Sequence, residues 1–281
     1  MPYWEMDGSE PLVSPENALE YYGKLMGGAD LGLPPVLIAT FQTVVLEHLG
    51  RRLDLAVSSR WPAPAFFQLA RATLDDREIA IARLPIGAPA AALALELMIA
   101  AGVRSAFIVG SAGSLRPDLP AGSIAVPSSA VRHDGTSHHY LAAGEPAEPS
   151  PVVAGALLAA AARRGITPVR GPIWTTDAPY RECAGTVTRL REEGVLAVEM
   201  EAAALFAVAR HRGVDAGLIV SVSDELGEEW RPSFHSLAYR RGILAAADIA
   251  LDAAAAMGRG RTGSGTGTNT DGHGRARTDT D

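Results

Sequence analysis

Two carboxylates and a thioether stand together at one junction of this chain. Glu199, Met200 and Glu201 follow a short apolar run, residues 195–198, and precede an Ala-rich segment that begins at Ala202. The apolar run predicts a buried strand and the Ala-rich segment a helix, so these side chains fall at the carboxyl end of a strand. In an open α/β sheet that end faces the ligand crevice. The competing interpretation is that the two acids only complement the dipole of the following helix.

Two further polar segments follow apolar runs. Residues 110–113, Gly-Ser-Ala-Gly, come after the run 106–109, and residues 221–225, which contain Asp224, come after the run 217–220. We interpret each as a loop after a strand. Glycines let backbone N–H groups approach a ligand, and Ser111 adds a hydroxyl. Either segment alone is more typical of a turn, but three polar strand ends in one sheet favour a shared pocket.

These residue types suit cleavage of an N-glycosidic bond, which builds positive charge on the sugar and negative charge on the leaving base. Glu201 would hold the sugar 2′- and 3′-hydroxyls and stabilise the oxocarbenium-like sugar, with Met200 packed on its apolar face. Asp224, held protonated, would give a proton to the base nitrogen as it leaves. Ser111 and the neighbouring amides, including that of Gly110, would orient the nucleophile.

Composition bounds the class of protein. The chain has 281 residues, 47% of them hydrophobic, which suits one domain with a sizeable core. A formal net charge of −7 without a basic block argues against nucleic acid or an anionic membrane as partner. No apolar run reaches the roughly 18 residues that a membrane span needs. The single cysteine, Cys183, cannot form an intrachain disulfide, and we expect a cytoplasmic protein.

Strand and helix patterns alternate between residues 34 and 257, which predicts a single α/β domain with a central, mainly parallel sheet. Before it lies an N-terminal segment, residues 1–33, with a helix cap at Ser14. Residues 69–73 and 78–84 predict a hairpin that turns at Asp75 and Asp76. Residues 258–281 are almost wholly Gly, Thr, Arg and Asp, and we expect a disordered tail there.

Six segments of the chain resemble, in the same order, the purine nucleoside and uridine phosphorylase superfamily with its related nucleosidases. They are LPIGAPAAALALELM (84–98), FIVGSAGSL (107–115), AGSIAVPSSAVRHDGTSHHYL (121–141), WTTDAPYRE (174–182), VEMEAAALFAVA (198–209) and VSVSDEL (220–226). The resemblance implies a mixed β-sheet flanked by helices, assembled as a trimer or as a hexamer of dimers. In such assemblies a neighbouring subunit commonly completes the sugar site.

The resemblance also implies roles for single residues. The VEME run matches the ribose-binding motif and so assigns the sugar to Glu199, Met200 and Glu201. Asp224 matches the acid of purine-specific members, whereas uridine-specific members carry an Asn-Arg pair there, so a purine is favoured. The family builds its base pocket from the segment that here contains Trp174, Thr176, Tyr180 and Arg181, with Pro179 where an aromatic ring often stacks on the base.

The cationic residues of the family's phosphate site are replaced in this chain. Ile108 stands where many bacterial phosphorylases have Arg, residues 39–43 replace a Gly-Asp-Pro-x-Arg loop, and the partner subunit's Arg, expected near Ala65, is missing. A buried phosphate dianion without cationic donors is costly. Arg60, Arg83 and Arg132 are the candidate replacements. Arg132 is the strongest of them because it follows a strand in the matching VRHDGTS stretch.

The sequence therefore predicts a nucleoside phosphorylase, a pentosyltransferase that uses phosphate as co-substrate and needs no cofactor or metal. A nucleosidase that attacks with water is the first alternative, with His133 or Asp134 as the base. A catalytically silent nucleoside-binding protein is the second. We interpret His133, His138 and His139 as loop residues and not as metal ligands, because no Cys or paired carboxylates accompany them.

Overall fold

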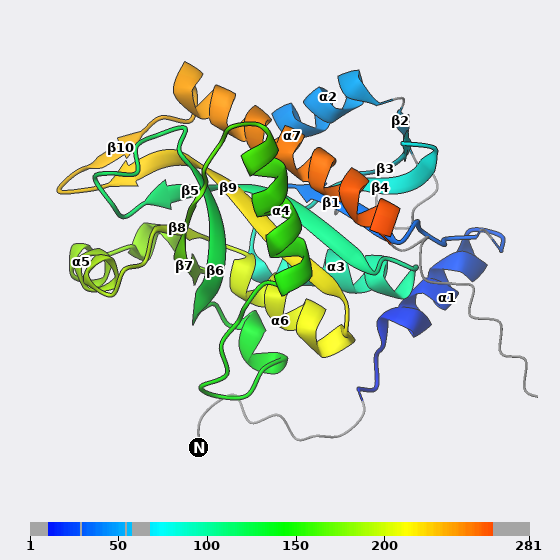
Figure 1. Cartoon of the computed structure of the whole chain (residues 1–281). Coiled ribbons are helices and arrows are strands. Elements are labelled where there is room, and N and C mark those ends of the chain that lie inside the picture. The colour runs from blue at the N-terminus through cyan, green and yellow to red at the C-terminus, as the bar shows by residue number, and fades with distance from the viewer. Residues whose placement is uncertain (1–10, 29, 54, 58–67, 261–281) are drawn as a thin grey trace, which may run out of the picture.

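The computed structural model describes residues 11–28, 30–53, 55–57 and 68–260. Within these residues the strands form one ten-stranded mixed sheet with helices on both faces (Figure 1). The strands are β1 (Val36–Thr40), β2 (Leu55–Val57), β3 (Gln68–Leu74), β4 (Arg77–Arg83), β5 (Ser105–Ser114), β6 (Ile124–His133), β7 (Val169–Thr176), β8 (Ala197–Glu199), β9 (Asp215–Leu226) and β10 (Trp230–Pro232).

The helices are interspersed among these strands along the chain. They are α1 (Pro15–Leu25), α2 (Thr43–Arg52), α3 (Ala88–Ala100), α4 (Pro151–Arg163), α5 (Ala184–Glu192), α6 (Ala202–Arg212) and α7 (Leu237–Gly260), with 3₁₀ turns η1 (Thr136–His139) and η2 (Pro179–Arg181). The predicted single α/β architecture with a flanked mixed sheet is confirmed. The expectation of a mainly parallel sheet is wrong, because antiparallel pairings among the described strands are as many as parallel ones. Helix α7 continues to Gly260, three residues beyond the expected end of the domain at residue 257.

The sheet is partly closed on itself. Its strand order is β10-β9-β6-β7-β8-β5-β1-β4-β3-β2, and β9 pairs with β5 as well, so β5, β8, β7, β6 and β9 form a ring. Strands β1, β4, β3 and β2 extend from β5 as an open sheet. Because β1, β5 and β9 are mutually parallel through β5, their carboxyl ends lie at one edge. Polar residues at these three ends are thereby brought together.

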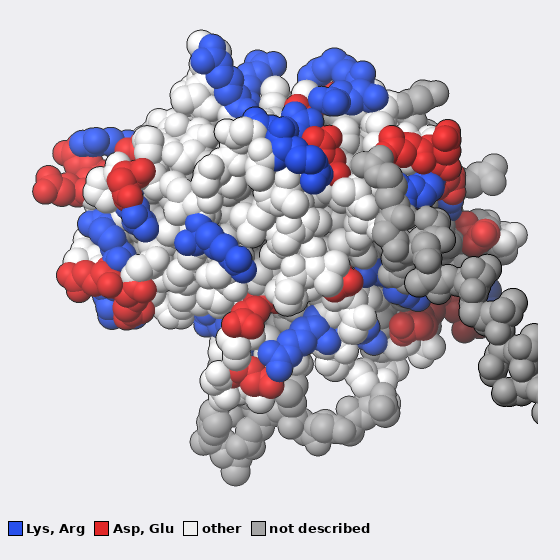
Figure 2. Space-filling view, in the orientation of Figure 1, with Lys and Arg blue, Asp and Glu red and all other residues white. Residues whose placement is uncertain are grey.

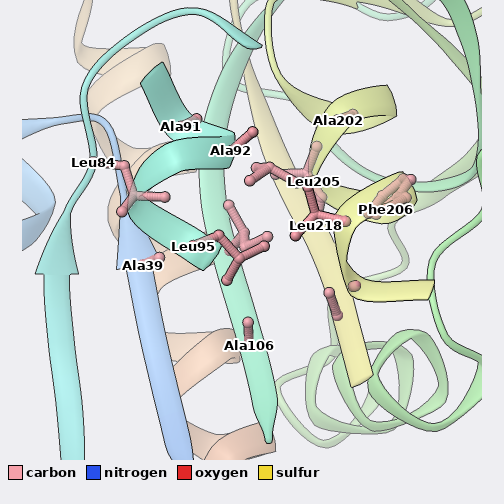
Figure 3. Packing of buried hydrophobic residues seen from close by; sticks show 14 of the residues in the cluster. Ala39, Leu84, Ala91, Ala92, Leu95, Ala106, Ala202, Leu205, Phe206 and Leu218 are labelled. Atoms are coloured by element: carbon pink, nitrogen blue, oxygen red, sulfur yellow. The ribbon is translucent and has the colours of Figure 1, made fainter. Parts of the chain in front are cut away.

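Two hydrophobic layers hold the helices on the sheet. On one face α3 and α6 pack on β1, β5 and β9 through Leu95, Leu205, Phe206 and Leu218 (Figure 3). On the other face α2, α4 and α7 bury a second cluster. Residues 202–209 of α6 are all buried, which is why that segment has no polar face in the sequence.

The local turn signals agree with the structure. Asp75 and Asp76 adopt φ of 49° and 60° between β3 and β4, the left-handed geometry of a tight hairpin that Asp tolerates better than most residues. The Ser14 hydroxyl accepts a hydrogen bond from the Asn17 amide at 3.1 Å and caps α1. The predicted hairpin and helix cap are confirmed.

The polar segments at 110–113 and 221–225 are strand, not loop. Strand β5 continues through Ser114 because it pairs with β9 on one side and with β8 on the other. Strand β9 continues to Leu226 for the same reason, since it pairs with β5 and with β10. Partners supplied by distant segments therefore extend both strands beyond the apolar runs from which they were predicted.

The surface carries charges of both signs. On the face drawn in Figure 2, acidic and basic side chains are interspersed, and a largely uncharged area lies over α4. Among the helices of the described residues, none combines the length and hydrophobicity that a membrane span requires.

Candidate active site

A cavity of about 600 Å³ lies where β5, β8 and β9 end, within the size range of small-molecule sites. The three polar segments predicted to share a pocket all contribute to it. Strand β5 supplies Ser111, the β8–α6 junction supplies Glu199 and Met200, and β9 supplies Asp224. The remaining wall comes from the η2–α5 segment and from the β9–β10 hairpin with the residues that follow it. It includes Pro179, Tyr180, Glu182, Val187, Leu226, Trp230 and Phe234.

A bulge and a glycine place Asp224 in this cavity. The β5–β9 register shifts between Ala112 and Gly113, so that Gly113 lies opposite Asp224. A Cβ atom on Gly113 would stand 2.5 Å from the Leu226 side chain and 3.0 Å from a carboxylate oxygen of Asp224. Bulges commonly re-aim a side chain beside an active site. Gly113 is therefore needed so that the Asp224 carboxyl can lie against β5.

Two donors hold the Asp224 carboxyl, which is only 8% exposed. The Ser223 hydroxyl lies 2.7 Å from Oδ1, and the Trp230 indole N–H donates to Oδ2 at 2.8 Å. No Lys or Arg pairs with Asp224 among the described residues. Sequence reasoning missed Trp230, because no spacing rule links an aromatic ring in a hairpin to an acid on the preceding strand.

Glu199 is fixed by the start of α6. The Thr175 hydroxyl donates to its Oε1, and the amides of Glu201 and Ala202 donate to its Oε2 at 2.7 Å each. Thr175 in turn accepts a hydrogen bond from the Ala203 amide at 2.9 Å. Glu199 thus satisfies amides that have no partner inside the helix. The interpretation that the acids complement the start of the following helix therefore applies to Glu199, which also lines the cavity.

Glu201 has a different environment. It is buried, lies outside the lining residues, and accepts a hydrogen bond from the Gly87 amide at 2.6 Å. Gly87 precedes α3 with φ of 100°, a conformation that favours glycine. Burial, and next the charge of Glu199, raise the pKa of Glu201 to about 8, whereas burial raises that of Glu199 to about 7 against the opposing hydrogen bonds. Of these two interacting carboxyls, Glu201 therefore binds its proton more tightly.

An uncharged polar network surrounds Ser111. The Gln42 amide nitrogen donates to the Ser111 hydroxyl at 3.0 Å, and the Thr40 hydroxyl donates to the Gln42 carbonyl oxygen at 3.0 Å. The phenol of Tyr239, on α7, also hydrogen-bonds Ser111, and burial raises the pKa of that phenol. Among the described residues that line the cavity, none is Lys, Arg or His. Gln42 and Tyr239 escaped sequence reasoning because only the fold brings them to β5.

Arg132 serves its own loop and not the cavity. Its guanidinium donates to the Ser137 hydroxyl at 3.1 Å and to the backbone carbonyls of Ser137, Leu141, Ala142 and Glu145 at 2.8 to 3.1 Å. Through these hydrogen bonds the guanidinium stabilises the conformation of the segment after β6. The expectation that Arg132 binds phosphate is therefore corrected, because the N–H groups of its guanidinium already have acceptors within the loop. Arg60 and Ala65 lie outside the described residues.

Of the four residues predicted to form the base pocket, only one lines the cavity. Tyr180 lines the cavity and is fully exposed, whereas Trp174, Thr176 and Arg181 are not among the lining residues. Thr175 faces Glu199, and neighbouring residues of a strand point to opposite sides. Trp174 accordingly packs in a cluster with Val187, Val198 and Leu226, so that it supports the cavity wall from behind.

Three other candidates also lie outside the lining. Gly110 is in the middle of β5, where a Cβ atom would meet Leu218 and Val220 at 3.4 and 3.6 Å. The Asp134 carboxylate accepts hydrogen bonds from the Ser137 amide and hydroxyl, and the His133 ring packs edge-on against Trp174 at 5.8 Å. Neither of the two bases considered for water attack therefore faces the cavity.

Residues 37–255 match the sequence model of the phosphorylase superfamily. The chain belongs to this superfamily. A guanosine phosphorylase of Halorubrum lacusprofundi is 34% identical over 160 residues, 57% of this chain and 66% of the relative. A uridine phosphorylase of Haemophilus influenzae is 27% identical over 163 residues, 53% of this chain and 65% of the relative. The matched segments thus span just under two thirds of these phosphorylases.

A solved structure shares the fold. Purine nucleoside phosphorylase from Toxoplasma gondii, in complex with immucillin-H, superposes with a TM-score of 0.74 over 81% of this chain and 93% of its own, at 22% identity. The partly closed mixed sheet with helices on both faces is therefore a fold that this purine nucleoside phosphorylase also adopts.

Proposed function

We propose that this protein is a nucleoside phosphorylase that cleaves the N-glycosidic bond of a purine nucleoside with phosphate, giving free base and pentose 1-phosphate. The observation that carries the proposal is the cavity that Ser111, Met200 and Asp224 line together, with the buried Glu201 carboxyl beside it. Membership of the phosphorylase superfamily supports the same chemistry.

The proposed reaction divides the work between these residues. Glu201 holds the sugar hydroxyls, and Met200 packs on the sugar. As the bond from C1′ to the base nitrogen breaks, its electron pair goes to the base and Asp224 transfers a proton to a base ring nitrogen. A phosphate oxygen forms the new bond to C1′, with Ser111 and Gln42 holding the phosphate. Positioning in the cavity supplies much of the remaining rate enhancement.

The carboxyl of Glu182 favours a purine. Glu182 lines the cavity, and burial, followed by the charge of Asp224, raises its pKa to about 7. A carboxylate accepts hydrogen bonds from N–H groups, which the edge of a 6-oxopurine offers at N1 and, in guanine, at the 2-amino group. Uracil instead places a carbonyl on each side of its single N–H. Glu182 therefore suits the base of guanosine, the substrate in the name of one relative.

Arg83 is the cation that we propose for phosphate. It ends β4 directly opposite Thr40 of β1, at the sheet edge that also carries Gln42 and Ser111. Its Nε–H donates to the Gln68 side chain at 3.0 Å, a neutral partner that does not compete electrostatically for the charge. A bidentate guanidinium is well suited to phosphate.

The proposal also covers the oligomeric state of the protein and its location in the cell. We propose a cytoplasmic homo-oligomer, a trimer or a hexamer, in purine salvage. Helix α1 buries none of its residues, and Leu12, Val13, Tyr21 and Leu25 are between 63% and 98% exposed on and before it. Grouped exposed apolar side chains commonly mark a subunit interface.

One observation favours a second function, hydrolysis by water. The part of the cavity lining that the structure describes includes no Lys, Arg or His, and the Gln42–Ser111 pair can orient a water as readily as a phosphate oxygen. A protein that only binds nucleosides is less well supported, because binding a base does not require the acid Asp224.

A product assay separates the three functions. The full chain is incubated with inosine, guanosine, adenosine, uridine and AMP, with and without phosphate, and free base and ribose 1-phosphate are measured. Base release that requires phosphate, with stoichiometric ribose 1-phosphate, supports the proposal. Release in phosphate-free buffer indicates a nucleosidase. Tight binding without release of any base would leave only the binding protein.

A further inference from the structure

We infer that Trp230 is a positioning residue for Asp224, holding one carboxyl oxygen in place while the other transfers its proton to the leaving base. The inference rests on the proposed cleavage of a nucleoside, and it adds a residue from outside the segments that match the family motifs. It applies equally whether phosphate or water attacks the sugar.

The hairpin geometry fixes the contact. Trp230 begins β10, which pairs antiparallel with β9 so that Trp230 lies opposite Leu226 and Pro232 opposite Asp224. The indole N–H reaches back across the hairpin to Asp224 Oδ2 at 2.8 Å, although 61% of Trp230 is exposed. Its ring lies 6.3 Å from that of Phe234, and both rings line the cavity. The polar edge of a largely exposed indole thus points inward to the acid.

The two oxygens of Asp224 are held by chemically different donors. An indole N–H can only donate, so the bond to Oδ2 persists whether the carboxyl is protonated or ionised. A hydroxyl can donate or accept, and the Ser223 hydroxyl has a second acceptor, the Ala112 carbonyl oxygen, at 3.3 Å. Ser223 can therefore release Oδ1 at no loss of a partner. This assigns Oδ1 as the oxygen that carries and transfers the proton, with Trp230 on Oδ2.

The bond from Trp230 strengthens during the reaction. As the C1′–base bond breaks, the proton moves from Oδ1 of Asp224 to the base and the carboxyl becomes a carboxylate. A hydrogen bond to a charged acceptor is stronger than one to a neutral acceptor. The indole N–H therefore stabilises the transition state more than the ground state, which raises the rate constant and leaves substrate binding nearly unchanged.

The test removes the N–H and keeps an aromatic ring. We expect Trp230→Phe to lower kcat for the best purine nucleoside by about 10- to 100-fold, the effect of one hydrogen bond to a charged group, with little change in KM. Trp174→Phe is the matched control, because Trp174 lies outside the cavity lining and its indole nitrogen has no hydrogen-bond partner among the described residues. We expect the control variant to unfold in a single transition when followed by fluorescence. We also expect it to lack the fall in kcat at unchanged KM that marks Trp230→Phe.

A double-mutant cycle distinguishes positioning from a structural role. If Trp230 acts through Asp224, then Trp230→Phe introduced into the Asp224→Asn protein lowers kcat by less than about twofold, since residues that act as a unit are not additive. A full additive loss, an equal loss in KM, or no loss in the single variant overturns the inference. A wild-type protein that releases no base from any nucleoside instead overturns the proposed function itself.

Discussion

Glu199 and Glu201 are adjacent buried carboxyls, yet we expect opposite effects on stability when each is changed to glutamine. Glu201→Gln keeps a carbonyl oxygen for the Gly87 amide and removes a group that must be ionised at high pH. Glu199→Gln leaves a single acceptor oxygen where the hydroxyl of Thr175 and the amides of Glu201 and Ala202 now find two.

The magnitude for Glu201 follows from its pKa. Burial raises that pKa from an ordinary value of 4.5 to about 8. Between these values the folded protein holds a proton that the unfolded chain lacks, so the free energy of unfolding falls as pH rises, by up to about 1.4 kcal/mol per pH unit. The stabilisation that this bound proton provides is fully present below pH 4.5. It falls as pH rises from 4.5 to 8 and is absent above pH 8. Glu199 and Glu182, whose pKa values are also raised, contribute a slope of the same sign. We therefore expect Glu201→Gln to remove the Glu201 part of the slope, so that its advantage over wild type grows by a few kcal/mol from pH 5 to pH 8.

Glu199→Gln acts at every pH. A glutamine amide would direct N–H groups at backbone N–H groups of α6, and each buried donor left without an acceptor costs about 1–3 kcal/mol. We therefore expect a loss of stability at pH 5 as well as at pH 8.

Urea unfolding followed by circular dichroism checks both expectations. Wild type and the two variants are measured at pH 5, 6, 7 and 8 at one protein concentration, because oligomerisation makes stability depend on concentration. An unchanged pH slope in Glu201→Gln would refute the assignment of the proton to Glu201. Equal stability of Glu199→Gln and wild type would refute the capping role.

Four further changes test the site. Asp224→Asn should lower kcat by about 10²–10⁴-fold with folding intact, measured as base release. Arg83→Gln should raise KM for phosphate by about 10- to 100-fold, the value of a charge-assisted bond, and an unchanged KM would exclude Arg83 from the phosphate site. Arg132→Gln should instead lower the urea midpoint and leave KM for phosphate unchanged, since its guanidinium binds loop carbonyls. Glu182→Gln should reduce kcat/KM for guanosine about tenfold relative to kcat/KM for uridine, which is the effect of losing one hydrogen bond to a charged group. An equal loss for both nucleosides would contradict a role of Glu182 in base recognition.

Local sequence patterns were enough to predict the main helices and strands and the region of the site. The hairpin at Asp75 and Asp76 follows from residues that tolerate positive φ, and the cap at Ser14 from a hydroxyl three residues before an orphan amide. Polar residues directly after buried apolar runs predicted where β5, β8 and β9 meet, because parallel strands end at one edge.

Tertiary structure alone decided which polar groups face the cavity. Whether Arg132 reaches a phosphate or its own loop depends on carbonyls up to 13 residues away in a fold that the sequence pattern does not specify. Trp174 and Trp230 look alike in sequence, yet β7 buries the first behind the wall and the β9–β10 hairpin brings the second to Asp224. Side-chain type and periodicity encode which face a residue prefers, but a hydrogen bond needs a partner at about 3 Å, and that partner is supplied by strands joined only in the folded chain.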